Sequence, residues 1–400
     1  MPKKFYRKIL KNGMTLIFEE RDLPVVSVGI AVRYGGINES LSERGIAHFI
    51  EHMFYKGTKK RTSKQISQEI EKNGGIMNGF TEEQITAFWC KMPSEKLDIA
   101  LNVLSDMVKN PLFNAEELKK ERKVIFEEMK IYHDNPSHYV FDKIQRFLYG
   151  NPLGTPLIGT HESMNSIDRK KMLKKFREVY KSSNMILCVV GKADFDELVK
   201  FAEQNFRKEK GKIKKQKIAL KNNYKIETRK GIDQANMVLA FHSPLTTDKK
   251  IYAAKVLIAI MAHGMSSRLF REIRDKRNLA YSFLGDVTAN KDFSYSYVYV
   301  IGAMKENVEK IKKIILNEFK KVSKKLMKKE LRATQNQLIG NYLISMENSE
   351  GQMSQLLLSE IDGKVKEFYE FEKNIRAVKL EDVKKLAKIK KYSFFALVPE

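Results

Sequence analysis

The sequence contains few cysteines and no long apolar run. Cys90 and Cys188 are the two cysteines in 400 residues, and they show neither a CxxC pair nor a zinc-finger spacing. We expect both thiols to be reduced and buried, and neither to be a nucleophile, because neither has a paired base in sight. No apolar stretch approaches the roughly 18 residues of a membrane span, and the first twenty residues lack the apolar core of a signal peptide. These absences predict a cytoplasmic protein that does not bind membranes.

Basic residues outnumber acidic ones, but they do not gather in one place. The 74 Lys+Arg and 49 Asp+Glu residues give a formal net charge of +25, and the lysines are spread through the whole chain. Only residues 207–217, RKEKGKIKKQK, form a dense basic run. Dispersed charge is typical of a solvated surface, so we expect no nucleic-acid partner. A nucleic-acid-binding function is an alternative that rests on charge alone.

The length and the apolar content indicate two domains with sizeable cores. Four hundred residues exceed the usual size of one domain, and 42% of the residues are hydrophobic. Alternating apolar and polar residues around Lys11-Asn12-Gly13 predict a hairpin. The other elements expected in the first half are strands at 24–36 and 184–194, two strands within 74–92, and helices around 48–52 and at 63–73, 94–109 and 114–132.

A similar order recurs in the second half, which predicts an internal duplication of about 200 residues per copy. The elements expected there are a strand at 235–245, helices at 250–263 and 266–277, two strands within 281–304, and helices at 305–325 and 327–348. We therefore expect an α+β fold with two related domains, residues 1–206 and 223–400, joined by a basic linker at 207–222. Each domain is expected to hold a mostly antiparallel sheet with helices packed on it.

Two of the seven histidines flank a glutamate in the run GIAHFIEHMFYKGT. On a helix, His48, Glu51 and His52 share an arc of roughly 100°, and the positions around them are apolar, so we expect a buried helix. Imidazoles at i and i+4 can both reach one zinc ion, and Glu51 is placed to act on a water molecule there. This HxxEH order inverts HExxH and is a signature of zinc peptidases. The other five histidines lack ligand spacing and are expected to be packing or surface residues.

A third zinc ligand is expected from the helix at 114–132. Glu121 and Glu128 flank its apolar stripe, whereas Glu127 should face solvent and Glu117 lies at the start of the helix. Two carboxylates that enter a core seven residues apart need a cation or hydrogen bonds to compensate their burial. Helical periodicity does not choose between Glu121 and Glu128 as the ligand.

Four segments of the sequence resemble the pitrilysin and insulinase family of zinc peptidases, which includes the mitochondrial processing peptidase. They are GIAHFIEHMFYKGT, NGGIMNGFTEEQITAF, ERKVIFEE and SSRLFREIRDKRNLAYS. The segments span most of the chain in the order that the family shows. The short chain is similar to the half-length bacterial members, in which a subunit of two related domains pairs with another subunit to enclose a chamber.

The resemblance implies a role for each residue of the expected zinc site. In the family's ERxxxxxE pattern the last glutamate binds zinc and the first supports the site, and these map onto Glu128 and Glu121. His48 and His52 would be the other two ligands of one zinc ion per chain, and Glu51 would be the general base. The implied activity is that of a zinc metalloendopeptidase.

The resemblance also implies a strand that binds substrate. In NGFTEEQITAF, Asn78, Gly79 and Phe80 correspond to an edge strand that pairs with an extended peptide. Gly79 and Gln84 depart from the alanine and the acidic residue that are more common there. Because a peptide added to a sheet edge is held by main-chain hydrogen bonds, one enzyme of this kind can accept varied sequences.

The second half of the chain is expected to complete the site without binding metal. In RDKRNLAY, the family's arginine and tyrosine fall on Arg274 and Tyr281, which would hold the substrate backbone and the oxyanion. Because one chain carries every piece, we expect a homodimer that cleaves peptides or unfolded segments. A heterodimer with a degenerate paralogue, or a non-catalytic subunit of such a pair, is the alternative.

Overall fold

A six-stranded sheet forms in the first half of the chain in the computed structural model, which describes residues 4–400. Its order is β1-β2-β6-β3-β5-β4, and every neighbouring pair is antiparallel except β2 and β6. The predicted hairpin joins β1 to β2, and Gly13 takes the positive φ of its turn (87°). The strands are β1 (Phe5–Ile9), β2 (Thr15–Glu20), β3 (Val25–Val32), β4 (Ile76–Thr81), β5 (Thr86–Pro93) and β6 (Met185–Gly191).

A five-stranded sheet in the second half repeats this topology. Its order is β7-β11-β8-β10-β9, and the pair β7 and β11 is parallel while the others are antiparallel. The parallel pair thus matches β2 and β6, and the run β8-β10-β9 matches β3-β5-β4. The predicted duplication and the mostly antiparallel sheets are confirmed. The strands are β7 (Tyr224–Arg229), β8 (Ala235–His242), β9 (Ala280–Ala289), β10 (Ser294–Ala303) and β11 (Ser393–Pro399).

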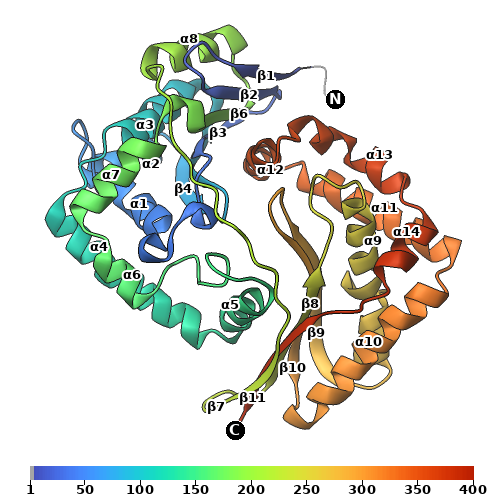
Figure 1. The fold of residues 1–400 in the computed structure, drawn as a ribbon. Coiled ribbons are helices and arrows are strands. Elements are labelled where there is room, and N and C mark those ends of the chain that lie inside the picture. The colour runs from blue at the N-terminus through green and yellow to red at the C-terminus, as the bar shows by residue number, and fades with distance from the viewer. Residues whose placement is uncertain (1–3) are drawn as a thin grey trace. The chain divides into compact units, whose positions relative to one another are not determined.

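Helices follow the strands of both sheets and cover them in Figure 1. Most predicted helices lie within a few residues of their expected bounds, but the one expected at 266–277 contains a π-helical segment, Phe270–Asp275. The helices of the first half are α1 (Ile46–Phe54), α2 (Ser63–Glu71), α3 (Leu97–Lys109), α4 (Ala115–Asp134), α5 (Pro136–Leu148), α6 (His161–Ser166), α7 (Arg169–Val179) and α8 (Phe195–Asn205). Those of the second half are α9 (Ile251–Ala262), α10 (Val308–Lys324), α11 (Lys328–Ser345), α12 (Ser349–Ile361), α13 (Phe371–Arg376) and α14 (Leu380–Leu386).

The two sheets exchange covering helices. The chain divides into one unit made of residues up to 129, 155–217 and 345–369, and another made of residues 130–154, 218–344 and 370–400. Helix α12 therefore packs on the first sheet, where Met353 and Leu357 join a buried cluster with Ile17 and Ile186. Helix α5 packs on β8 and β11 of the second sheet. Each sheet thus completes its core with a segment from the other half of the sequence.

Each unit buries a continuous apolar core. Strand β6 is buried along its whole length, as expected for a strand between two neighbours in a covered sheet. In the second unit, α9 is buried on nearly all sides, which agrees with its almost wholly apolar sequence. Within residues 4–400, none of the helices is both long and apolar enough to cross a membrane.

The segment between the two halves has little regular structure. Residues 207–219 form neither helix nor strand, and they lie in the predicted linker. Leu220 makes an isolated bridge with Tyr149 just before β7 begins. The domain limits at 206 and 223 remain a prediction, since the contacts group segments that lie far apart in the sequence.

Candidate metal centre

Helix α1 carries HFIEH and is held at its start by a buried carboxylate. Gly45 adopts a left-handed conformation (φ 92°) just before the helix. Glu39 accepts hydrogen bonds from the backbone N–H groups of Gly45 and Ala47, each at 2.8 Å. Its neighbour Arg44 is fully buried, lies 3.6 Å from Glu39 and donates a hydrogen bond of 2.8 Å to Glu83. These contacts fix the helix N-terminus, whose partial positive charge favours a carboxylate.

The apolar side of α1 faces the core, so its polar groups point the other way. Phe49, Ile50 and Met53 are fully buried, whereas His48, Glu51 and His52 are partly exposed. Positions i, i+3 and i+4 share one face of a helix, and the predicted face is the one observed. The three ionisable side chains therefore project from α1 toward α4 and β4 rather than into the apolar core.

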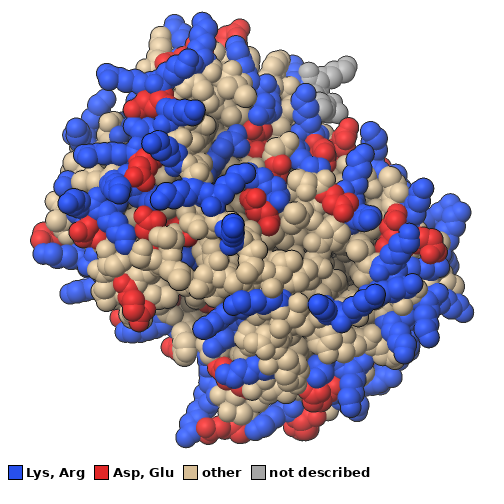
Figure 2. All heavy atoms as spheres, viewed as in Figure 1, with Lys and Arg blue, Asp and Glu red and all other residues tan. Residues whose placement is uncertain are grey.

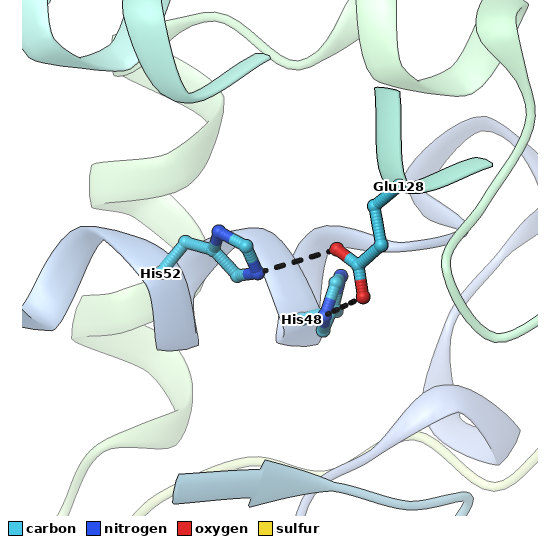
Figure 3. Close-up of side chains that lie close together, drawn as sticks. All are labelled: His48, His52 and Glu128. Carbon is cyan, nitrogen blue, oxygen red and sulfur yellow. Dashed lines mark ion pairs between the residues drawn. The ribbon is translucent and has the colours of Figure 1, made fainter. Parts of the chain in front are cut away.

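Glu128 of α4 completes a cluster with the two histidines (Figure 3). Its carboxylate oxygens lie 3.8 Å from Nε2 of His48 and 3.6 Å from Nε2 of His52. The three ligand atoms lie within 4.8 Å of one another. Zinc ligands lie about 2 Å from the ion, so the ligands of one ion are about 3 to 4 Å apart. Two imidazole nitrogens and one carboxylate thus fit a zinc ion with an open fourth position.

Glu121, about two turns before Glu128 on α4, holds the other ring nitrogen of His52. Nδ1 of His52 lies 3.2 Å from Oε2 of Glu121, and Nζ of Lys56 lies 2.5 Å from Oε1. Burial alone would raise the pKa of Glu121, but the hydrogen bonds from His52 and Lys56 lower it. The ionised carboxylate therefore accepts the Nδ1 proton and leaves the Nε2 lone pair directed at Glu128, the orientation that a metal requires.

The protonation state of His48 also suits a metal ligand. Burial lowers the pKa of His48 to about 3, and the neighbouring His52 adds to this. At neutral pH the imidazole is therefore uncharged and its lone pair is free to bind a cation. Among residues 4–400, one group of three side chains could hold a metal ion, and it consists of His48, His52 and Glu128.

Glu51 lies beside the cluster and contacts the edge strand β4. Oγ1 of Thr81 donates a hydrogen bond of 2.5 Å to Oε2 of Glu51. Burial raises the pKa of Glu51, while the Thr81 hydrogen bond and His52 oppose the rise. A carboxylate with a raised pKa that is held near a metal position can take up a proton and return it.

Strand β4 lies at the open edge of the first sheet, because among residues 4–400 it pairs only with β5. Asn78 is exposed and accepts a hydrogen bond from the N–H of Gly79 through its own Oδ1. Phe80 is partly buried against the cluster beneath the sheet. Side chains alternate along a strand, so Met77, Gly79 and Thr81 share the face that contacts α1.

Arg274 and Tyr281 lie together in the second unit. Arg274 belongs to the π-helical segment, and its guanidinium lies 5.2 Å from the centre of the Tyr281 ring. Tyr281 stands near the start of β9, an edge strand, and is 70% exposed. An exposed tyrosine beside an arginine on a sheet edge is available to a ligand, and their role toward the zinc site remains a prediction.

Sequence periodicity did not find every polar group around Glu51 and His52. Lys56 follows His52 by four residues on the α1 face, and the i, i+4 spacing was a usable signal for it. Thr81 follows Phe80 directly, and no local pattern distinguishes a threonine that reaches a glutamate thirty residues away. The hydrogen bond between Thr81 and Glu51 depends on the packing of α1 against β4, which no local sequence pattern encodes.

Comparison with known sequences assigns the two halves separately. Residues 16–161 match the family described as insulinase (peptidase family M16), and residues 166–338 match the family described as peptidase M16 inactive domain. An uncharacterized zinc protease of Rickettsia felis is 32% identical over 356 residues, which cover 87% of this chain and 85% of that one. An uncharacterized zinc protease of Bacillus subtilis is 30% identical over 388 residues, or 96% and 94% of the two chains.

Solved structures show the same fold at low sequence identity. A protease from Helicobacter pylori has a TM-score of 0.92 at 20% identity and covers 99% of both chains. A putative M16-like peptidase from Alicyclobacillus acidocaldarius has a TM-score of 0.88 at 17% identity, covering 100% of this chain and 99% of that one. The sequence matches span both halves, and the chain belongs to the insulinase family of peptidases, peptidase family M16.

Proposed function

We propose that this protein is a zinc-dependent endopeptidase that cleaves peptides or unfolded segments. The observation that carries the proposal is the cluster of His48, His52 and Glu128 with Glu51 beside it. Each chain offers one such cluster among its described residues, so we propose one zinc ion per chain. When bound, zinc supplies a positive charge that lowers the pKa of a water molecule and polarises the scissile carbonyl.

Glu51 would move the proton in this reaction. Its Oε2 is held by Thr81, and its raised pKa suits a group that removes a proton from the attacking water and gives it to the leaving amine. Glu121 would keep His52 in one tautomer and orientation, and Lys56 would keep Glu121 charged. Glu51 would thus transfer the proton, and Glu121 and Lys56 would align His52.

Substrate would bind along the open edge of β4. This edge has no neighbouring strand among the described residues and lies next to Glu51, and an extended peptide can add there as a further strand if Asn78 releases the N–H of Gly79. Asn78, Gly79 and Phe80 would line this position. We further propose that Arg274 and Tyr281 hold the substrate backbone and the oxyanion, and that a homodimer encloses the sites in a chamber.

A nucleic-acid-binding function receives less support. Figure 2 shows lysine and arginine side chains scattered over the visible face, interspersed with acidic and uncharged residues. Many of the cations near the surface are paired with carboxylates, such as Lys119 with Glu116 and Lys276 with Glu272. A continuous basic surface, which would track a phosphate backbone, is not what this face presents.

Cleavage of a quenched fluorescent peptide library tests the proposal. The purified protein is assayed as prepared, after a chelator, and after zinc is added back. We expect cleavage that the chelator abolishes and zinc restores. Zinc binding at one ion per chain without cleavage of any peptide would indicate a subunit that needs a partner. Absence of zinc binding would overturn the proposal.

A further inference from the structure

Tyr55 extends the polar face of α1 by one turn. It lies four residues after Glu51 and seven after His48, positions that share a helix face. Its ring packs against Phe88 with the ring centres 6.2 Å apart. Its hydroxyl oxygen is buried and makes no hydrogen bond to any of residues 4–400. A buried hydroxyl without a partner costs about 1 to 3 kcal/mol, so its persistence calls for an explanation.

Gly79 of β4 leaves the space in which this hydroxyl lies. A Cβ atom placed on Gly79 would stand 2.8 Å from the Tyr55 hydroxyl, 3.1 Å from the backbone oxygen of Ala87 and 3.2 Å from Oε1 of Glu51. The hydroxyl and Oε1 therefore approach the same point beneath the strand. Gly79 does not have a positive φ, so its backbone does not require glycine. The space, rather than the backbone conformation, accounts for a glycine here.

The two oxygens of Glu51 thus meet different groups. Oε2 accepts the hydrogen bond from Thr81, and Oε1 faces the region shared by Gly79 and the Tyr55 hydroxyl. Burial raises the pKa of Tyr55, and the negative charge of Glu51 raises it further, so the hydroxyl keeps its proton. A neutral hydroxyl can donate a hydrogen bond, but that of Tyr55 donates none to any of residues 4–400.

We propose that Tyr55 is a positioning residue for Glu51, and that residue 79 is glycine because the Tyr55 hydroxyl occupies the space of a side chain. The inference rests on the proposed peptidase function. The hydroxyl fills the space next to Oε1 while Thr81 holds Oε2 by a hydrogen bond, so that Glu51 keeps one orientation between the metal position and the substrate strand.

Three variants separate this role from simple packing. Tyr55→Phe removes the hydroxyl, Gly79→Ala introduces the Cβ, and the third variant combines them. Thermal unfolding is measured on zinc-free protein, and kcat, KM and zinc content are measured on loaded protein. Tyr6→Phe serves as the matched tyrosine control, since the Tyr6 ring stacks on Phe18 and Phe195 far from the cluster in sequence. Gly340→Ala is the glycine control, because nothing lies within 4 Å of its added Cβ.

We expect Tyr55→Phe to bind zinc as the wild type does and to lose roughly tenfold in kcat with little change in KM, because Oε1 of Glu51 can turn into the space that the hydroxyl leaves. Gly79→Ala should lower the unfolding temperature, because its Cβ meets the hydroxyl. The double variant should recover part of the unfolding temperature, because the contact with the hydroxyl is gone while that with the Ala87 backbone oxygen remains, but it should not recover kcat. Recovery of stability without recovery of turnover is the pattern that packing alone does not produce.

Two results would overturn the inference. One is a Tyr55→Phe protein whose kcat stays within twofold of the wild type, and the other is a double variant no more stable than Gly79→Ala alone. Both leave the proposed function intact if the wild type still shows zinc-dependent cleavage. A wild type that binds no zinc overturns the proposed function and, with it, the role of Tyr55 toward Glu51. The unfolding temperatures still decide whether Tyr55 and Gly79 interact.

Discussion

At the scale of single residues, the side chains proposed to bind the metal differ from the one proposed to transfer the proton. His48, His52 and Glu128 converge on one point, whereas Glu51 lies on the same helix face but hydrogen-bonds Thr81. A residue that binds no metal can be changed without removing the metal. The two roles are therefore separable by substitution.

The first prediction concerns Glu51→Gln. The amide keeps the shape of the side chain but cannot accept a proton, so we expect zinc content equal to that of the wild type and a loss of turnover of about 10² to 10⁴-fold. Zinc is measured by atomic absorption and turnover with a fluorescent peptide. Cleavage at the wild-type rate would contradict the role of Glu51 as the base.

The second prediction compares three glutamates of α4. Glu128→Gln should abolish tight zinc binding, while Glu121→Gln should weaken it by about 10- to 100-fold, because Glu121 only orients His52. Glu127→Gln is the matched control, since Glu127 is exposed. Zinc affinity is measured by competition with a chelating dye. Equal losses for Glu121→Gln and Glu128→Gln would show that the two residues do not differ in role.

Helical periodicity reached part of this site from the sequence alone. It placed His48, Glu51 and His52 on one face, and it placed Glu121 and Glu128 beside the buried stripe of α4. Both glutamates do face α1, because seven residues make nearly two turns. Which of the two approaches both imidazoles depends on the distance between two helices, and periodicity within one helix holds no such information.

At the scale of elements, α1 depends on the buried carboxylate before it. Glu39 accepts two backbone N–H groups at the helix start and lies beside the buried Arg44. Burial raises the pKa of Glu39 to about 7, although Arg44 and the two N–H groups oppose the rise. Arg44 also donates hydrogen bonds to the carbonyl of Thr155 and to Glu83, next to the end of β4. The network thus connects the helix that carries His48 and His52 to the edge strand.

The third prediction is that Glu39→Ala destabilises the fold by about 3 kcal/mol. The substitution leaves the buried N–H groups of Gly45 and Ala47 without their acceptor and removes a counterion of Arg44. The midpoint of urea unfolding of zinc-free protein measures the loss. Glu95→Ala is the control, because Glu95 is exposed. A loss below about 1 kcal/mol would mean that water or a shift of Arg44 replaces the contacts.

Helix α12 is attached to the first sheet by a second buried carboxylate. Glu360 accepts two hydrogen bonds from Arg7, at 2.7 and 2.8 Å, and one of 2.8 Å from Arg33. Burial alone would raise the pKa of Glu360, but the two arginines lower it below its usual value of 4.5. A lowered pKa in the folded state contributes stability that is present above pH 4.5 and is lost as the pH falls through the folded-state value.

The fourth prediction follows from the lowered pKa of Glu360 in the folded state. Glu360→Gln should cost about 3 kcal/mol at pH 7, because it leaves two arginines without their partner. The difference from the wild type should shrink as the pH falls below about 4.5, where the carboxylate of the unfolded chain takes up a proton, and it should be lost as the pH falls through the lower folded-state pKa. Urea unfolding at several pH values measures it, with Glu95→Gln as the control. A difference that does not change with pH would assign the loss to shape rather than charge.

The helix exchange could not be predicted from the sequence. The stripe of Met353, Leu356 and Leu357 indicates a helix with one buried side, but nothing local says which sheet it covers. The same holds for α5, whose amphipathic sequence lies within the first half and packs on the second sheet. Local propensity decides which elements form, and contacts across hundreds of residues decide where they pack.

At the scale of the whole molecule, each chain carries every residue of the proposed site. The metal-binding cluster and the edge strand lie in one unit, and Arg274 and Tyr281 lie in the other. A homodimer would therefore need no specialised partner. Light scattering should give twice the mass of one chain, and dilution below the dissociation constant should reduce specific activity if the chamber is required.

The fifth prediction asks which chain's tyrosine serves a given zinc site. We expect Tyr281 to serve the cluster of its own chain, so Glu51→Gln and Tyr281→Phe chains should each be impaired and should stay impaired when co-expressed with different tags and purified as mixed dimers. If the tyrosine instead served the partner's cluster, each mixed dimer would contain one intact site of two, and the purified mixed dimers would show about half of wild-type activity. Dimers of one tagged variant alone are the control for both outcomes. Restoration to that level would reject assembly of the site within one chain, because only exchange between chains can combine an intact Glu51 with an intact Tyr281.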